Sequence, residues 1–146
     1  MNMKILAGVA LASVFGAAYL LLDLEEPTSS KEVSVAAQKS GALVSIDLPD
    51  LLSTQAQMGK RAFDAVCASC HGANAVGRDG MGPPLIHKIY EPSHHADFAF
   101  LRAVRTGVRA HHWSFGDMPA QEGLTDADVE LVTQYIRELQ RANGIE

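Results

Sequence analysis

The chain has 146 residues, with 12 lysines and arginines against 17 aspartates and glutamates, which gives a formal charge of -5. This acidic balance argues against nucleic acid as the main partner. Hydrophobic residues make up 47% of the chain and charged residues 20%, a composition typical of a folded protein rather than a disordered or collagenous one. Two cysteines, Cys67 and Cys70, are too few for a disulfide-stapled scaffold or a four-thiolate zinc site.

Residues 1–22 are predicted to be a transmembrane anchor. Their core is an uncharged run, ILAGVALASVFGAAYLLL, with Lys4 before it and acidic residues after it. As a helix this run is roughly 27 Å long, close to the ~30 Å bilayer core and longer than a typical cleavable signal core. A cleaved signal peptide stays open as the alternative. The flanking charges place the N-terminus in the cytoplasm, which puts the rest of the chain on the periplasmic side of the inner membrane.

Residues 23–52 are predicted to link this anchor to a domain that spans residues 53–146. They contain Pro, Ser and several acids and show no sustained helical period. About 30 flexible residues span roughly 30 Å, enough for a small domain to move between neighbours in a membrane. The end of this segment, GALVSIDLPDLL, is too apolar for a pure linker, and we expect it to pack either on the domain or on a partner.

Two short helices are predicted first in the domain. From Gln55, small and apolar residues recur at spacings of three and four as far as Val66, which predicts a helix that runs into the cysteine pair. The run DFAFLRAVRT over residues 97–106 predicts a second helix, with Phe98 and Leu101 on different faces and Gly107 following its last turn.

A longer helix is predicted from Thr125, which forms a capping-box-like pair with Asp128, to its end at Asn143 and Gly144. Its periodicity predicts a buried stripe of Val129, Val132, Tyr135, Ile136 and Leu139. No convincing paired strands lie between the three helices. The predicted fold class is therefore all-α.

The residues Cys67-Ala68-Ser69-Cys70-His71 form a Cys-x-x-Cys-His motif, the signature of covalent c-type haem attachment. On a helical turn, positions i, i+3 and i+4 share one face, so both thiols can form thioethers to the haem vinyl groups while His71 points at the iron. A thioredoxin-like pair would follow a strand, and a Cys2His2 zinc site would need a His-x3-5-His partner that this chain lacks. The motif therefore predicts one covalent haem c with His71 as a metal ligand.

Met118, in Gly116-Asp117-Met118-Pro119, is the expected second axial ligand, because it follows a long loop and precedes the last helix. A thioether is a soft donor that stabilises ferrous iron and raises the reduction potential. With both axial positions filled, no small-molecule substrate reaches the iron. The ligand set indicates an electron carrier and not an enzyme.

Over residues 53–146 the chain resembles the class I c-type cytochromes, in particular the monohaem, membrane-anchored bacterial type. The resemblance rests on the haem motif and, in chain order, on Gly59, Phe63, Gly82-Pro83-Pro84-Leu85, Met118-Pro119, Val132 and Tyr135. It implies a helical domain around one haem, in which Gly59 allows the first and last helices to approach closely and Phe63 packs near Tyr135. It also implies that the carbonyl of Pro83 binds the His71 imidazole and that the partners are redox proteins.

Two histidine pairs, His94-His95 and His111-His112, depart from the simplest members of that family. Three interpretations stay open. The histidines are solvated or hydrogen-bonded, with Trp113 or Arg105 near a haem propionate; they form a second metal site, for instance for copper; or His111 or His112 replaces Met118 on the iron.

The predicted function is electron transfer between periplasmic or membrane partners by a membrane-tethered, single-haem cytochrome. One alternative is a fixed electron-entry subunit of a larger membrane oxidoreductase, in which GALVSIDLPDLL and a basic patch of Arg102, Arg105 and Arg109 would be contact surfaces. Another is a metal-handling or ligand-sensing haem protein that uses the histidine pairs.

Overall fold

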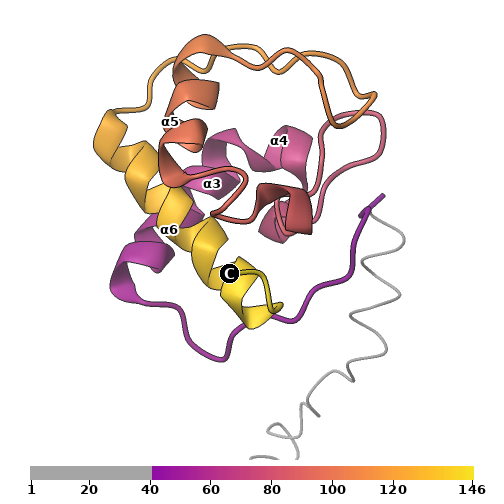
Figure 1. The fold of residues 1–146 in the computed structure, drawn as a ribbon. Helices are drawn as coiled ribbons and strands as arrows, with labels where there is room; N and C mark the ends of the chain where they lie inside the picture. Colours follow the sequence, from indigo (N-terminus) through magenta and orange to yellow (C-terminus); the bar gives the residue numbers. More distant parts are fainter. Residues whose placement is uncertain (1–40) are drawn as a thin grey trace, which may run out of the picture. The chain divides into compact units, whose positions relative to one another are not determined.

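The computed structural model describes residues 41–146, so the predicted anchor and residues 23–40 of the predicted linker lie outside the described residues. The helical elements are shown in Figure 1 and are, in order, α3 (Thr54–Val66), α4 (Ala68–His71), η1 (Ala73–Ala75), η2 (Lys88–Tyr90), α5 (Asp97–Thr106) and α6 (Asp126–Ala142). Within the described part of the chain, extended pairing is limited to two isolated bridges, Arg78 with Gly82 and Val108 with Met118. The predicted mainly helical fold is confirmed for these residues. None of these helices is both long and apolar enough to span a bilayer.

The helices α3 and α6 cross (Figure 1), and their closest approach involves Gly59, as the resemblance implies. A Cβ atom on Gly59 would lie 1.9 Å from the carbonyl oxygen of Leu131, so only glycine fits at the crossing. One turn further along α3, Phe63 packs edge to face against Tyr135, with ring centroids 5.6 Å apart. This crossing fixes the C-terminal end of α3, where the haem motif begins.

The helix α6 begins with the predicted capping box. The Thr125 hydroxyl accepts a hydrogen bond from the Asp128 backbone N–H at 3.2 Å, and the Asp128 carboxylate accepts one from the Thr125 backbone N–H at 2.9 Å. The predicted apolar stripe of α6 is buried. A second stripe, which the apolar pattern did not indicate, is polar and also buried: Thr133, Arg137 and Gln140.

Arg137 and Gln140 connect α6 to the chain that precedes α5. The guanidinium of Arg137 donates to the carbonyl of Tyr90 at 2.7 Å, to Asp97 Oδ1 at 2.8 Å and to Gln140 Oε1 at 2.6 Å. The Gln140 amide nitrogen in turn donates to the carbonyls of Leu85 and Tyr90 at 2.9 and 3.0 Å. These bonds satisfy loop carbonyls that burial would otherwise leave without donors.

The apolar segment GALVSIDLPDLL contacts the domain itself. The backbone N–H groups of Leu43 and Val44 donate to the carbonyl of Val76 at 3.1 and 3.2 Å. Further along, the Asn143 side chain pairs with the backbone of Asp47 through two hydrogen bonds of 2.8 Å. Of the two packing partners expected for this segment, the structure shows the domain.

The helix α5 has the predicted bounds and ends at Gly107, whose φ of 72° turns the chain back on itself. The buried side chain of α5 is Val104. The sequence pattern assigned Phe98 to a face of this helix but did not predict its burial, and Phe98 is 67% exposed. After the turn, Val108 and Met118 exchange two backbone hydrogen bonds of 2.9 Å. These bonds close the loop 108–118, which carries the second histidine pair, Trp113 and Met118.

Candidate haem site

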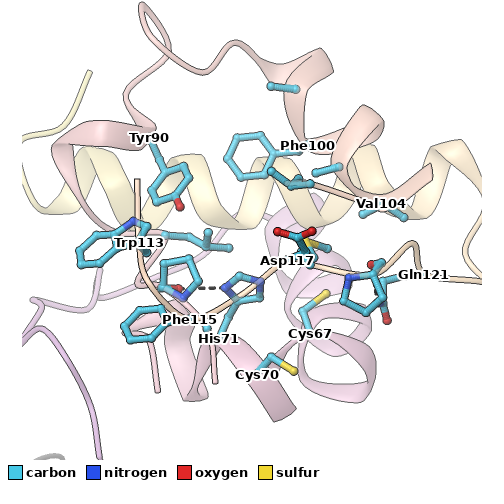
Figure 2. Close-up of a pocket in the computed structure, with 18 of the residues that line it drawn as sticks. Cys67, Cys70, His71, Tyr90, Phe100, Val104, Trp113, Phe115, Asp117 and Gln121 are labelled. Carbon is cyan, nitrogen blue, oxygen red and sulfur yellow. Dashed lines mark hydrogen bonds between the residues drawn. The ribbon is translucent and has the colours of Figure 1, made fainter. Parts of the chain in front are cut away.

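The haem motif lies across the junction of α3 and α4. Cys67 ends α3, and its carbonyl accepts hydrogen bonds from the backbone N–H groups of Cys70 at 3.1 Å and His71 at 2.9 Å. This tight turn places both thiols and the imidazole on the wall of one cavity, as Figure 2 shows. Both cysteines are free thiols. The helical geometry expected of the motif is therefore present.

The cavity has a volume of about 260 Å³ and an apolar wall. Helices α3, α4, α5 and α6 contribute to it, together with the segment around Pro83 and the loop 108–118. Figure 2 shows Tyr90, Phe100, Trp113 and Phe115 around the space next to His71. An apolar space with a few polar groups at its edge suits a large planar cofactor.

His71 is held in one orientation by the carbonyl of Pro83. The Nδ1 atom of His71 donates to this oxygen at 2.9 Å, which is the contact that the resemblance implies (Figure 2). Burial lowers the pKa of His71, while the hydrogen bond to Pro83 acts in the opposite direction. The imidazole is therefore neutral near pH 7, with the Nε2 lone pair available to a metal.

The thiol of Cys67 does not resemble that of a redox-active cysteine pair. Burial, with a smaller contribution from the neighbouring Cys70, raises its pKa to about 11. Reactive cysteine pairs need the opposite, a thiolate formed by a lowered pKa. The geometry and the protonation state of Cys67 both disfavour the thioredoxin-like alternative.

Met118 lines the same cavity as the haem motif, and its backbone bonds to Val108 fix its position. The structure thus brings together Cys67, Cys70, His71, Pro83 and Met118, which are all the site residues predicted from the sequence. His111 and His112 line the cavity as well.

Trp113 provides a direct test of whether a haem fits. Its indole Nε1 is buried, and within residues 41–146 no acceptor meets hydrogen-bond geometry with it, although the Trp113 side chain lies close enough to the Tyr90 hydroxyl to oppose the rise that burial causes in the pKa of Tyr90. A buried donor of this kind needs an acceptor, which a haem propionate can supply. Arg105, the other residue expected near a propionate, binds Asp126 and the carbonyl of Leu124. The apolar wall, the two thiols, the neutral imidazole and this free donor fit a haem.

Several cavity residues were not predicted from the sequence, among them Met81, Tyr90, Phe100 and Phe115. Phe100 lies one turn before the buried Val104 on α5, and this i, i+4 spacing is the signal that identifies it. The other three lie outside the longer helices, where the sequence has no helical periodicity from which burial could be predicted.

Two thiols and an imidazole at positions i, i+3 and i+4 of a helical turn line an apolar cavity between crossed helices. This arrangement defines the class of proteins that attach haem covalently. The family model described as Cytochrome c matches residues 56–140, and the chain belongs to this family. No curated protein shows a significant match to the chain. The cofactor is accordingly one covalently bound haem c, and the family acts in electron transfer.

Proposed function

We propose that this protein is a membrane-tethered carrier that relays single electrons between periplasmic or membrane proteins, with His71 and Met118 as the axial iron ligands. The observation that carries the proposal is the shared cavity, since the haem motif and Met118 lie on its wall although 46 residues lie between His71 and Met118. Bound haem c supplies the one-electron chemistry.

Each residue of the site has a defined task in this proposal. The thiols of Cys67 and Cys70 attach the cofactor, and His71 offers Nε2 because Pro83 holds Nδ1. Met118 would supply the second side-chain ligand to the iron, which would close the iron to small molecules. The protein therefore binds the cofactor, excludes water and tunes the reduction potential.

The membrane tether and the periplasmic side rest on the sequence. The uncharged run over residues 5–22 is long enough to cross a bilayer, and its flanking charges favour a cytoplasmic N-terminus. Attachment to the inner membrane would keep the haem domain near redox partners in the same membrane.

The contacts of the domain favour a carrier over a fixed subunit. The segment GALVSIDLPDLL, one of two expected contact surfaces of a subunit, bonds to its own domain. Arg105, in the centre of the expected basic patch, is paired with Asp126. The segment and the central arginine of the patch thus have partners within the domain, which favours a carrier over a permanently bound subunit.

The test is the absorption spectrum of the full chain, expressed with a working haem maturation system and purified in detergent. We expect a pyridine haemochrome of c type, one haem per chain, and in the ferric protein the weak near-infrared band of methionine ligation. We expect no carbon monoxide binding by the reduced protein. A colourless product would overturn the haem assignment. Absence of the near-infrared band would overturn the assignment of Met118 as an iron ligand and would favour His111 or His112 in that role.

A further inference from the structure

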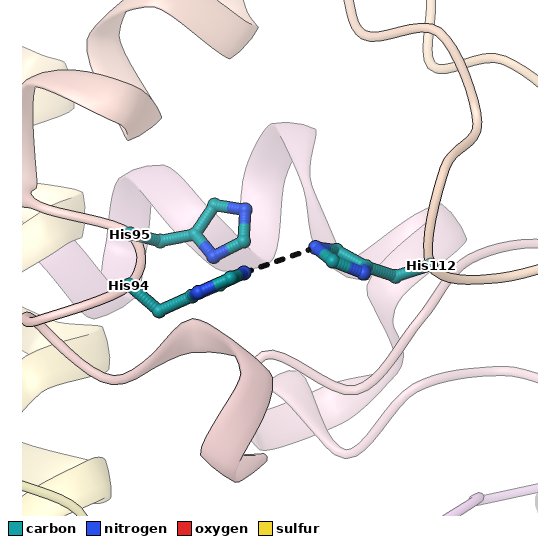
Figure 3. Close-up of side chains that lie close together, drawn as sticks. All are labelled: His94, His95 and His112. Atoms are coloured by element: carbon teal, nitrogen blue, oxygen red, sulfur yellow. Dashed lines mark hydrogen bonds between the residues drawn. The ribbon is translucent and has the colours of Figure 1, made fainter.

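Two histidine pairs that are distant in sequence meet in the folded protein. His94 and His95 lie in the turn before α5, and His112 lies in the loop 108–118 after it (Figure 3). One ring nitrogen from each of the three residues lies within 4.8 Å of the corresponding atoms of the other two. The turn at Gly107 and the Val108 to Met118 pairing bring the second loop back toward the first.

The separation of the ring nitrogens of His94 and His112 suits a shared tetrahedral metal ion. His94 Nε2 and His112 Nε2 are 3.3 Å apart (Figure 3). Two imidazole nitrogens, each about 2.05 Å from a metal and at the tetrahedral angle, are about 3.3 Å apart. A square-planar ion would bring adjacent nitrogens to about 2.9 Å. The observed distance is also long for an N–H···N hydrogen bond, for which about 3.0 Å is usual.

The third imidazole is already oriented for coordination. The Nδ1 atom of His95 donates to the carbonyl of Ile89 at 2.7 Å, so Nε2 carries the free lone pair. Metal-binding histidines are usually fixed in this way by an acceptor on the other ring nitrogen. The carbonyl of His95 accepts a hydrogen bond from the buried Arg137, which anchors the backbone at this position.

Desolvation and the neighbouring positive groups favour the neutral form of His95 and His112, which is the form that binds metals. Partial burial, followed by the nearby His94, His111 and Arg137, lowers the pKa of His95. Desolvation, followed by the neighbouring histidines, lowers the pKa of His112. His94 and His112 are exposed, which leaves the cluster open to ions from solution. Three imidazoles without a carboxylate suit zinc or copper rather than calcium or magnesium.

We propose that His94, His95 and His112 bind one divalent zinc-type cation in tetrahedral geometry, with water as the fourth ligand. This site uses none of the residues proposed to bind the iron, although His95 and His112 also line the haem cavity. A bound ion would join the turn before α5 to the loop that carries Met118. The site thus goes beyond electron transfer by the haem.

The test is calorimetric titration of the full-length, haem-loaded protein with zinc chloride after removal of any affinity tag. The thiols of Cys67 and Cys70 are consumed in haem attachment, so they do not compete for the ion. We expect one zinc per chain, and at least tenfold weaker binding for His94→Ala and for His112→Ala. The matched control is His87→Gln, since His87 is outside the cluster and glutamine retains an acceptor for the Ile89 N–H. This variant should bind zinc within twofold of the parent.

Absence of stoichiometric binding, or equal affinity in the parent and both alanine variants, would overturn the zinc site. X-ray absorption at the zinc edge provides a second measurement and should show nitrogen ligands at about 2.0–2.1 Å. The near-infrared band of the ferric haem is recorded on each variant. If His112→Ala changes that band, His112 binds the iron, and both the zinc site and the Met118 assignment are wrong. If the band is constant and zinc does not bind, only the zinc proposal fails.

Discussion

The carbonyl oxygen of Leu131 on α6 occupies the space that a Cβ atom on Gly59 of α3 would need, with 1.9 Å between the two positions. Neither group can move independently, because each belongs to a helical backbone. The haem motif begins at the end of α3, and three side chains of α6, those of Val129, Val132 and Ile136, line the same cavity. The crossing therefore sets the width of the haem cavity.

Gly59→Ala should destabilise the protein because the two helices must separate. In an unconstrained helix this change stabilises by about 0.5–1 kcal/mol, whereas overpacking against backbone should cost about 3 kcal/mol here. Urea unfolding of the haem-loaded protein, followed by circular dichroism, measures the difference. Gly80→Ala is the control for an added methyl group without a clash, since its Cβ position is open and only its positive φ should cost stability, by about 1 kcal/mol. A Gly59→Ala protein as stable as the parent would contradict the crossing.

Met118→Ala should retain the haem, abolish the near-infrared band and lower the reduction potential, because a soft thioether no longer stabilises ferrous iron. Potentiometric titration and carbon monoxide binding measure the change. The matched control is Met81→Ala, since Met81 also lines the cavity but is 49% exposed. It should leave the spectrum and the potential nearly unchanged. The assignment of Met118 as an iron ligand is wrong if Met81→Ala abolishes the band and lowers the potential while Met118→Ala changes neither.

Arg137→Met should reduce the free energy of unfolding by about 3 kcal/mol, because the buried Gln140 Oε1 and the carbonyl of His95 lose their donor. The ion pair itself contributes little, since Asp97 is 73% exposed, and Asp97→Ala should cost less than about 1 kcal/mol. Arg61→Met, at an exposed position of α3, should change stability by less than about 0.5 kcal/mol. Chemical unfolding of the three variants measures the free energy of unfolding of each. Equal effects for Arg137→Met and Asp97→Ala would assign the stabilisation to the ion pair instead.

The capping box of α6 should give stability a specific pH dependence. The pKa of Asp128 lies below its ordinary value of 3.8, because the Thr125 hydroxyl and then the Thr125 backbone N–H donate to the carboxylate. The unfolded chain binds the proton more tightly, so this contribution is complete above about pH 3.8 and is lost as the pH falls through the lower folded pKa. Asp128→Ala should therefore be less stable than the parent at neutral pH and converge with it toward about pH 2. Glu130→Ala, at an exposed position of the same helix, is the control.

The sequence alone determined the helices, the cofactor and the candidate ligands. Periodicity and capping residues act over one or two turns, so the bounds of α5 and the capping box of α6 could be predicted from neighbouring residues. The haem motif is local too, because one helical turn places Cys67, Cys70 and His71 on the same face.

Which distant groups meet depends on how the helices and loops pack. Arg137 and Gln140 are buried because the loop carbonyls to which they donate hydrogen bonds pack against this side of α6. The position of a loop cannot be predicted from the periodicity of a helix. The approach of His94 to His112 likewise depends on the turn at Gly107 and on the path of the loop 108–118. Contacts of this kind follow from the way in which segments separated in sequence pack together, and the order of residues does not encode them locally.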